Sequence, residues 1–275
     1  MNRKLRFLVS IAVLWLSVVP ARAGGINSDE AMTPNKGGFI LRLKGVYADA
    51  EASGTIRDAD TFKIVSVLAY GLREDLSLFL RTPLRYDEVE TRGPGGAGRV
   101  TREHFGVEDI TLFLKYRFWQ KDTSANDTFR VAWLAGLDVR TGDRQFSSDS
   151  YDPLSGFTFT LQRARHHLNG DTIFQVNTGS GLSGADSLRY DLGYSYRFYP
   201  ERYTPGRAFQ WDIVGEINGE YLTDGSHRVF LSPGLQYTVH RWRFETSLQL
   251  PVLQDLNPGR REVNYRIVTG FRYHW

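Results

Sequence analysis

Cysteine is absent from the 275 residues of the chain, which excludes a disulfide framework as a source of stability. Long apolar runs are equally scarce. The only uncharged apolar run lies at the extreme N-terminus, which excludes a helical membrane protein, and neither a Walker loop nor a dinucleotide fingerprint occurs. With 41% hydrophobic residues the chain is too apolar for a disordered protein. Aromatic residues, at 13%, and 27 glycines favour strands and tight turns over helical bundles.

The first 23 residues have the three parts of a secretory signal peptide: basic residues at positions 3, 4 and 6, an apolar stretch over 7–19, and small residues at 21 and 23. The apolar stretch is shorter than the roughly 20 residues that span a bilayer, which favours cleavage over an uncleaved anchor. Cleavage after Ala23 would remove four of the 34 basic residues and none of the 31 acids, leaving a net charge of −1. The sequence pI of about 9.0 therefore does not indicate a nucleic-acid partner, and we expect none.

From residue 38 onward, apolar and polar side chains alternate with the period of a β-strand. The predicted strands run about 11–14 residues, longer than the roughly 5–6 residues usual in globular sheets and close to the 9–11 that cross a bilayer at a tilt. A soluble sandwich also alternates, so strand length decides between the two classes. The twelve expected strands are 38–49, 60–71, 75–87, 106–118, 128–141, 155–165, 171–182, 187–199, 208–222, 228–239, 242–253 and 262–275.

The connections between these strands favour a membrane barrel. Tight turns are expected at 72–74 and 240–241 on one side, and long loops at 50–59, 88–105, 142–154 and 254–261 on the other, the asymmetry of bacterial outer-membrane barrels. Apolar faces also end in aromatic residues, as interfacial girdles do. We therefore predict an all-β, transmembrane antiparallel β-barrel of about 12 strands over residues 24–275, in contact with the lipid of the cell outer membrane, after a cleaved signal peptide at 1–23.

Short motifs spread over nearly all of the mature chain resemble the outer-membrane barrels named for the meta-pathway of phenol degradation, which are described as transporters. The resemblance implies a channel or uptake protein for small, hydrophobic or aromatic compounds. Residues 270–275 resemble the aromatic-terminated signal by which the barrel assembly machinery recognises outer-membrane barrels, so this machinery is an expected partner of the C-terminal strand. The matching segments are Thr33–Gly38, Tyr70–Leu72 with Leu76–Leu78, Gly106 with Asp109–Tyr116, Thr141–Asp143, Leu231–Tyr237 and Gln249–Val252.

The polar face of the predicted strands is unusually ionic, with basic residues in excess. Buried charges persist only when they are paired or hydrated, which leaves two compatible interpretations: a salt-bridged, water-filled interior that stiffens the barrel, or a charged conduit that selects solutes by sign. The excess of positive charge favours anionic solutes. The candidate residues for the lumen and for solute binding are Arg42, Lys44, Arg81, Lys115, Arg117, Arg140, Asp212, Glu216, Arg243, Glu245 and Arg272.

We expect no catalytic residue, metal site or cofactor, because the six histidines fall mostly in predicted loops or turns, including 166–170. The leading hypothesis is a channel or transporter for small solutes. Two alternatives remain: a structural or adhesion barrel without transport, and a barrel enzyme that acts on lipid. The second alternative would need a serine, a histidine and an acid to converge, and the sequence offers no such group in register.

Overall fold

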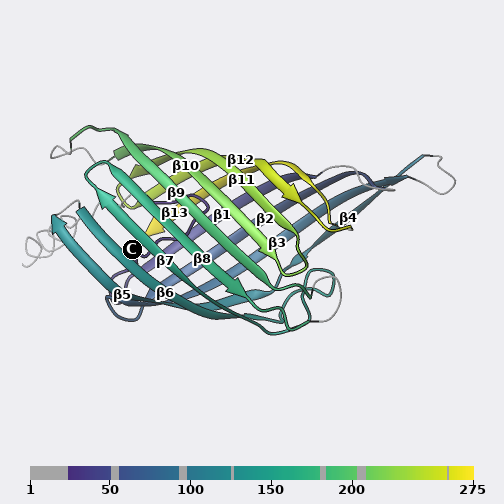
Figure 1. The fold of residues 1–275 in the computed structure, drawn as a ribbon, viewed down its shortest axis with the longest axis horizontal. Coiled ribbons are helices and arrows are strands. Elements are labelled where there is room, and N and C mark those ends of the chain that lie inside the picture. The colour runs from purple at the N-terminus through teal and green to yellow at the C-terminus, as the bar shows by residue number, and fades with distance from the viewer. Residues whose placement is uncertain are drawn as a thin grey trace, which may run out of the picture.

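In the computed structural model the strands form one antiparallel sheet that closes into a barrel, as predicted (Figure 1). The structure describes residues 24–50, 56–92, 98–124, 127–179, 184–202, 209–258 and 260–275; the predicted signal peptide lies outside these ranges. No helix in these ranges is long and apolar enough to cross a membrane. The strands are β1 (Phe39–Ala50), β2 (Ile56–Gly71), β3 (Leu76–Arg92), β4 (Arg99–Val107), β5 (Ile110–Ser124), β6 (Asp127–Val139), β7 (Asp152–Arg163), β8 (His166–Gln175), β9 (Ser187–Tyr199), β10 (Phe209–Leu222), β11 (His227–Val239), β12 (Trp242–Asp255) and β13 (Val263–His274).

These thirteen segments fill the twelve strand positions of the predicted barrel, each of which we call a stave. The count is twelve because β4 and β5 together fill one position, which is interrupted between them. Both pair with β3: β5 with its first part, Leu76–Arg81, and β4 with its last, Leu84–Arg92. The predicted strand over 106–118 covered only the middle of this stave. The β3–β4 hairpin extends beyond the rest of the barrel (Figure 1). Pairing of β1 with β13 closes the sheet.

The turn between β7 and β8 lies at Ala164 and Arg165, so the predicted turn at 166–170 is wrong. Two residues that usually favour turns are part of β8 instead. Asn169 points into the barrel and is 1% exposed. Gly170 lies under the ring of Phe159, which a Cβ at this position would approach to 2.6 Å, so the strand needs a glycine here for packing and not for a turn.

The two ends of the barrel differ as the sequence predicts, but two of the predicted long loops are wrong in extent: β2 begins at Ile56, inside the predicted loop 50–59, and β3 and β4 occupy most of the predicted loop 88–105. Short turns at 72–75, 164–165 and 240–241 mark one end, and the longer connections 140–151 and 256–262 lie at the other. In outer-membrane barrels the short turns face the periplasm. The chain termini of the sheet meet at this end, where the backbones of Phe39 and Trp275 exchange two hydrogen bonds of 3.0 and 3.1 Å and their rings stack.

Side-chain facing follows the predicted alternation and is inverted relative to a soluble protein. On β5, Leu112 is 42% exposed on the outer face whereas its neighbour Thr111 is 3% exposed inside. The outer face is thus apolar and suited to lipid, and the buried face is polar. Outward aromatic side chains, among them Phe118, Trp119 and Trp275, gather where strands reach the short-turn end. They form the girdle expected at a membrane interface.

The loop after β6 is organised by Asp109, which lies at the interruption between β4 and β5. One carboxylate oxygen accepts hydrogen bonds from the backbone of Thr141 (3.0 Å) and Gly142 (2.9 Å), and the other from the backbone of Ser148 (2.7 Å). Burial opposes ionisation, but the backbone N–H groups of Gly142 and Ser148 and the hydroxyls of Ser147 and Ser148 outweigh it and hold the pKa of Asp109 below its ordinary value. The loop therefore depends on a charged carboxylate.

We expect Leu112→Arg to destabilise the barrel by about 2–4 kcal/mol, because it places a cation near the bilayer midplane. Phe105→Arg is the matched control: it also faces outward, but from β4 in the projecting hairpin, where the cost should be about 0–1 kcal/mol. Urea titrations of folding in lipid vesicles measure both. Equal penalties would show that the lipid-facing band is wrongly placed.

Asp109→Asn should speed amide hydrogen exchange in residues 141–148 at least about tenfold at neutral pH, because hydrogen bonds to a charged group contribute about 1.5–3 kcal/mol. Since folding lowers the pKa of Asp109, its stabilisation is complete above the unfolded-state value and is lost as the pH falls through the folded-state value. The wild-type loop should then approach the variant in acid. As a control, Asp149→Asn removes an exposed ion pair with Arg140 and should leave the amide exchange of residues 141–148 unchanged at neutral and at acid pH.

Candidate functional site in the barrel lumen

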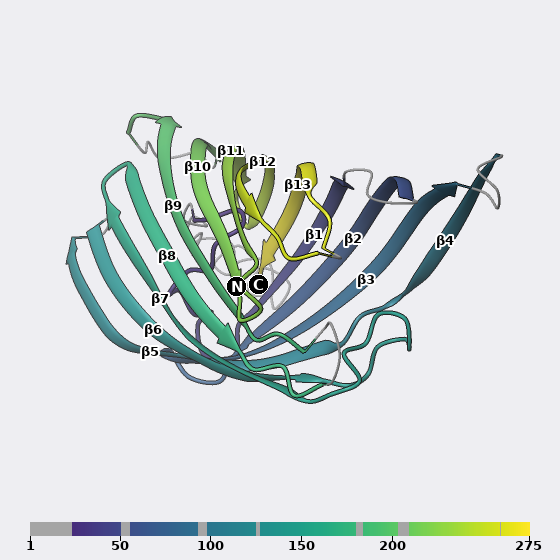
Figure 2. The same ribbon diagram turned by 45° about the vertical axis from the view of Figure 1, so that its right-hand side comes forward.

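The segment before β1 lies inside the barrel, which the sequence analysis did not predict (Figure 2). We call residues 24–34 the N-terminal plug. Ile26, Ser28 and Ala31 are almost completely buried by the surrounding strands. The side chain of Ile26 packs against Val214 and Val268, which makes a small apolar contact in an otherwise polar interior. The plug pairs with no strand, so its backbone needs hydrogen-bond partners from lumenal side chains.

Glu216 on β10 supplies the partners for the first turn of the plug. One of its oxygens accepts from the backbone and side-chain nitrogens of Asn27, both at 2.8 Å. The other accepts from the Ser28 hydroxyl at 2.6 Å and from the Ser28 backbone at 3.2 Å. All four contacts end on a carboxylate, and hydrogen bonds to a charged acceptor are stronger than neutral ones.

Strands β7 and β8 hold the middle of the plug. The Asp29 backbone N–H donates to Asp171 at 2.6 Å, and its carbonyl accepts from the Thr158 hydroxyl at 2.9 Å. The Ala31 N–H donates to the Thr160 hydroxyl at 2.9 Å. Polar side chains on the inward face of β7 and β8 thus provide the backbone hydrogen bonds that a neighbouring strand would otherwise make with the plug.

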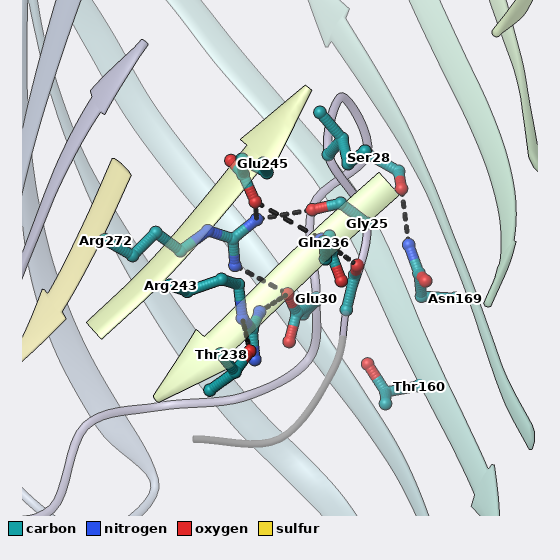
Figure 3. A network of polar contacts seen from close by, with 12 residues as sticks. Gly25, Ser28, Glu30, Thr160, Asn169, Gln236, Thr238, Arg243, Glu245 and Arg272 are labelled. Atoms are coloured by element: carbon teal, nitrogen blue, oxygen red, sulfur yellow. Dashed lines mark hydrogen bonds and ion pairs between the residues drawn. The ribbon is translucent and has the colours of Figure 1, made fainter. Parts of the chain in front are cut away.

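The plug contributes Glu30 to an ion-pair network at the seam where the barrel closes (Figure 3). Glu30 Oε1 lies 2.7 Å from Arg272 Nη1 and 3.7 Å from Arg243 Nη1. Glu245 lies 3.3 Å from Arg272 and 2.7 Å from Arg42. Burial alone would raise the pKa of Glu30, but the two guanidinium groups outweigh it and hold that pKa below its ordinary value. Two carboxylates therefore pair with three guanidiniums from β1, β12 and β13, which leaves the network with one net positive charge.

Two cations of β5 fix the remainder of the plug. Lys115 Nζ donates to the Glu30 carbonyl at 2.8 Å and lies 4.7 Å from the centre of the Phe79 ring. Arg117 donates to the hydroxyl of Thr33 at 2.6 Å and to the carbonyl of Glu74 at 2.5 Å. The plug is therefore bound by side chains from several strands around the lumen.

Beside the plug the lumen holds a cavity of about 910 Å³ that is strongly positive. Among the described residues that line it, thirteen are lysine or arginine and six are aspartate or glutamate. The walls formed by β1 and β2 add an apolar surface, which includes Val46, Val65 and Val67. The cavity is thus both cationic and partly apolar.

The structure brings most of the predicted site residues together. Arg42, Lys115, Arg117, Glu216, Arg243 and Arg272 contact the plug, and Glu245 joins the network through two of them. Lys44 and Arg81 line the cavity. Asp212 is fully buried but accepts from Gln210 at 2.8 Å, away from both plug and cavity.

The prediction for Arg140 is wrong. Strand β6 ends at Val139, so Arg140 is an exposed loop residue and pairs with Asp149 at 2.5 Å instead of pointing into the lumen. Asp29 and Glu30 were missed altogether, because the plug shows no strand alternation. The only available signal was the excess of interior cations, which required carboxylates from elsewhere. No group of three or more histidine, aspartate or glutamate residues in the described ranges is placed to hold a metal ion.

Comparison with solved structures shows the same fold in an outer membrane channel from Pseudomonas putida F1, at 14% sequence identity and a TM-score of 0.57, with 92% of this chain and 100% of that chain covered. The NanC porin (11% identity, TM-score 0.45, 85% and 98% covered) and the CymD monoaromatic hydrocarbon channel (13%, 0.42, 87% and 88%) are also similar. No curated protein sequence matches the chain.

The family comparison covers most of the barrel. A sequence profile described as "Putative MetA-pathway of phenol degradation" matches residues 46–254, from β1 to β12. This is the family that the short motifs resemble, and the closed twelve-stave barrel is an outer-membrane fold. The chain belongs to the family of outer-membrane barrels named for this pathway of phenol degradation.

Proposed function

We propose that this outer-membrane barrel is a narrow channel for small solutes that carry a carboxylate or phenolate. The observation that carries the proposal is the charge of the lumen, where basic residues outnumber acidic ones about twofold along the cavity. Rings of one charge select permeant ions by sign. The family description, which names phenol degradation, supports an aromatic or phenolic solute.

A closed barrel without transport is the second candidate, and one observation favours it. The plug occupies part of the lumen, where Glu30 pairs with Arg243 and Arg272 and the Ser28 hydroxyl donates to Glu216. Charged groups of the lumen thus have partners within the protein. A channel must therefore either conduct around the plug or move it. We also propose that the barrel has no catalytic activity, which the fold that it shares with an outer membrane channel supports.

We also propose two partners on the outside of the barrel. The apolar outer face suits outer-membrane lipid, and the C-terminal strand ending at Trp275 suits recognition by the barrel assembly machinery. Support for the second comes from the position of Trp275, whose backbone closes the barrel onto Phe39.

In planar bilayers we expect a small conductance that favours anions. Replacing both Lys44 and Arg81 with glutamine should shift the reversal potential toward cation selectivity, because both line the cavity. Arg140→Gln, at an exposed ion pair, should leave the potential unchanged. Selectivity should fall as salt rises, since the screening length shrinks from about 10 Å at 0.1 M to about 3 Å at 1 M. A cation-selective or silent wild type would contradict the proposal.

Glu30→Gln should loosen the plug, because breaking a buried ion pair on one side costs about 3–5 kcal/mol. Single-channel recordings should show a larger, more variable conductance, and protease should cleave the plug faster than in wild type. Asp60→Asn, at a carboxylate of β2 that is bonded to Tyr47 and not to the plug, serves as control. An unchanged conductance together with faster cleavage would mean that the plug does not restrict the pore.

A further inference from the structure

Three cations face the cavity without a close ion pair among the described residues. Lys44 on β1, Arg81 on β3 and Arg189 on β9 line it, and none makes an ion pair within 4.0 Å among the residues that the structure describes. Arg85, four residues beyond Arg81 on the same face, is instead paired with Asp87 and Glu108. The three cations are thus able to bind an anion that enters the cavity.

Apolar side chains lie directly beside two of these cations. In the strand register Lys44 faces Val65, and Arg81 faces Val67. Directly opposed residues on one face of a sheet have Cβ atoms about 4.5–5.5 Å apart. A solute whose charged group lies between the cations would therefore place its body against the two valines.

The plug already presents one carboxylate to these cations. Asp29 is held by its backbone, and its side chain is 37% exposed, with one oxygen 3.8 Å from Lys115 Nζ. Burial opposes ionisation, but the charges of Lys115, Arg42, Arg189 and Lys44 outweigh it and hold the pKa of Asp29 below its ordinary value. A solute carboxylate would compete with Asp29 for these cations.

We propose that the cavity binds monocarboxylates with an apolar body, the carboxylate between Lys44, Arg81 and Arg189 and the body against Val65 and Val67. This inference rests on the proposed anion channel and specifies its solute class. The cavity volume of about 910 Å³ lies within the range of small-molecule sites, about 300–1,000 Å³. Asp29 then acts as a resident competitor that keeps the site from binding its solute too tightly for release.

Isothermal titration calorimetry of the full barrel in lipid nanodiscs tests the solute class with three probes. Hexanoate has the charge and the apolar body, acetate lacks the body, and 1-hexanol lacks the charge. Each buried methylene strengthens binding about fourfold, so hexanoate should bind at least tenfold more tightly than acetate. Hexanol should bind at least tenfold more weakly than hexanoate, because it makes no charge-assisted contacts.

Three variants test the position of the site by opposite effects. Arg81→Gln should weaken hexanoate binding at least tenfold, because a charge-assisted contact is lost. Asp29→Asn should strengthen it several-fold, because it removes the competing charge but keeps the backbone bonds to Asp171 and Thr158. Arg85→Gln is the matched control on the same strand and should leave the affinity unchanged. Heat-modifiability on gels confirms folding of each variant, and Lys44→Gln replaces Arg81→Gln if the latter fails to fold.

The outcomes separate this inference from the proposed function. Equal affinity for hexanoate and acetate, or weaker binding by Asp29→Asn, overturns the inference, while an anion-favouring reversal potential would leave the channel standing. No hexanoate binding by the wild type also overturns it. Tight hexanoate binding by a barrel that conducts nothing would support the site and overturn the channel.

Discussion

The carboxylate of Glu30 is the group on which the arrangement of the interior depends. Closure of the sheet brings Arg42, Arg243 and Arg272 to neighbouring staves, and Glu245 alone cannot neutralise all three. Unpaired guanidiniums at this depth would be costly. Glu30 supplies a second negative charge from a segment outside the sheet, so the plug takes part in the electrostatics of the seam as well as occupying the lumen. The same segment presents Asp29 to the cations of the adjacent cavity, but forms no ion pair within 4.0 Å with Lys44, Arg81 or Arg189 among the described residues.

The fold could be predicted from alternation, because a lipid-facing side chain and a lumenal one must alternate along every stave. This sufficed for twelve staves, their facing and the two unlike ends. Positions where a residue's usual preference differs from its local role could not be predicted. Asn169 and Gly170 suggest a turn, but both are part of β8. Asn169 donates a hydrogen bond to Ser28 of the plug, and Gly170 leaves room for the ring of Phe159. The β4 extension was missed because its charged residues read as a loop.

For the site, the sequence could predict only which side chains of each strand point into the lumen. Alternation placed Arg42 and Arg272 inside, and it placed Arg140 there too because it could not show where β6 ends. Which cations are neutralised is a property of three-dimensional neighbours, and these include Asp29 and Glu30 from a segment with no periodic signal. The sequence thus predicts a cationic lumen but not the division between cations that hold the plug and cations that face the cavity.

The position of the plug has a consequence for the order of assembly. Asn27 binds Glu216 across 189 positions of the sequence, and Glu30 binds Arg272 across 242. The segment that leaves the ribosome early therefore finds its partners only when β10 and β13 are in place. Contacts of such separation form slowly, because the chain between them must first be ordered. Enclosure of the plug and pairing of β1 with β13 must then occur together, and folding of this barrel should end at its N-terminus rather than begin there.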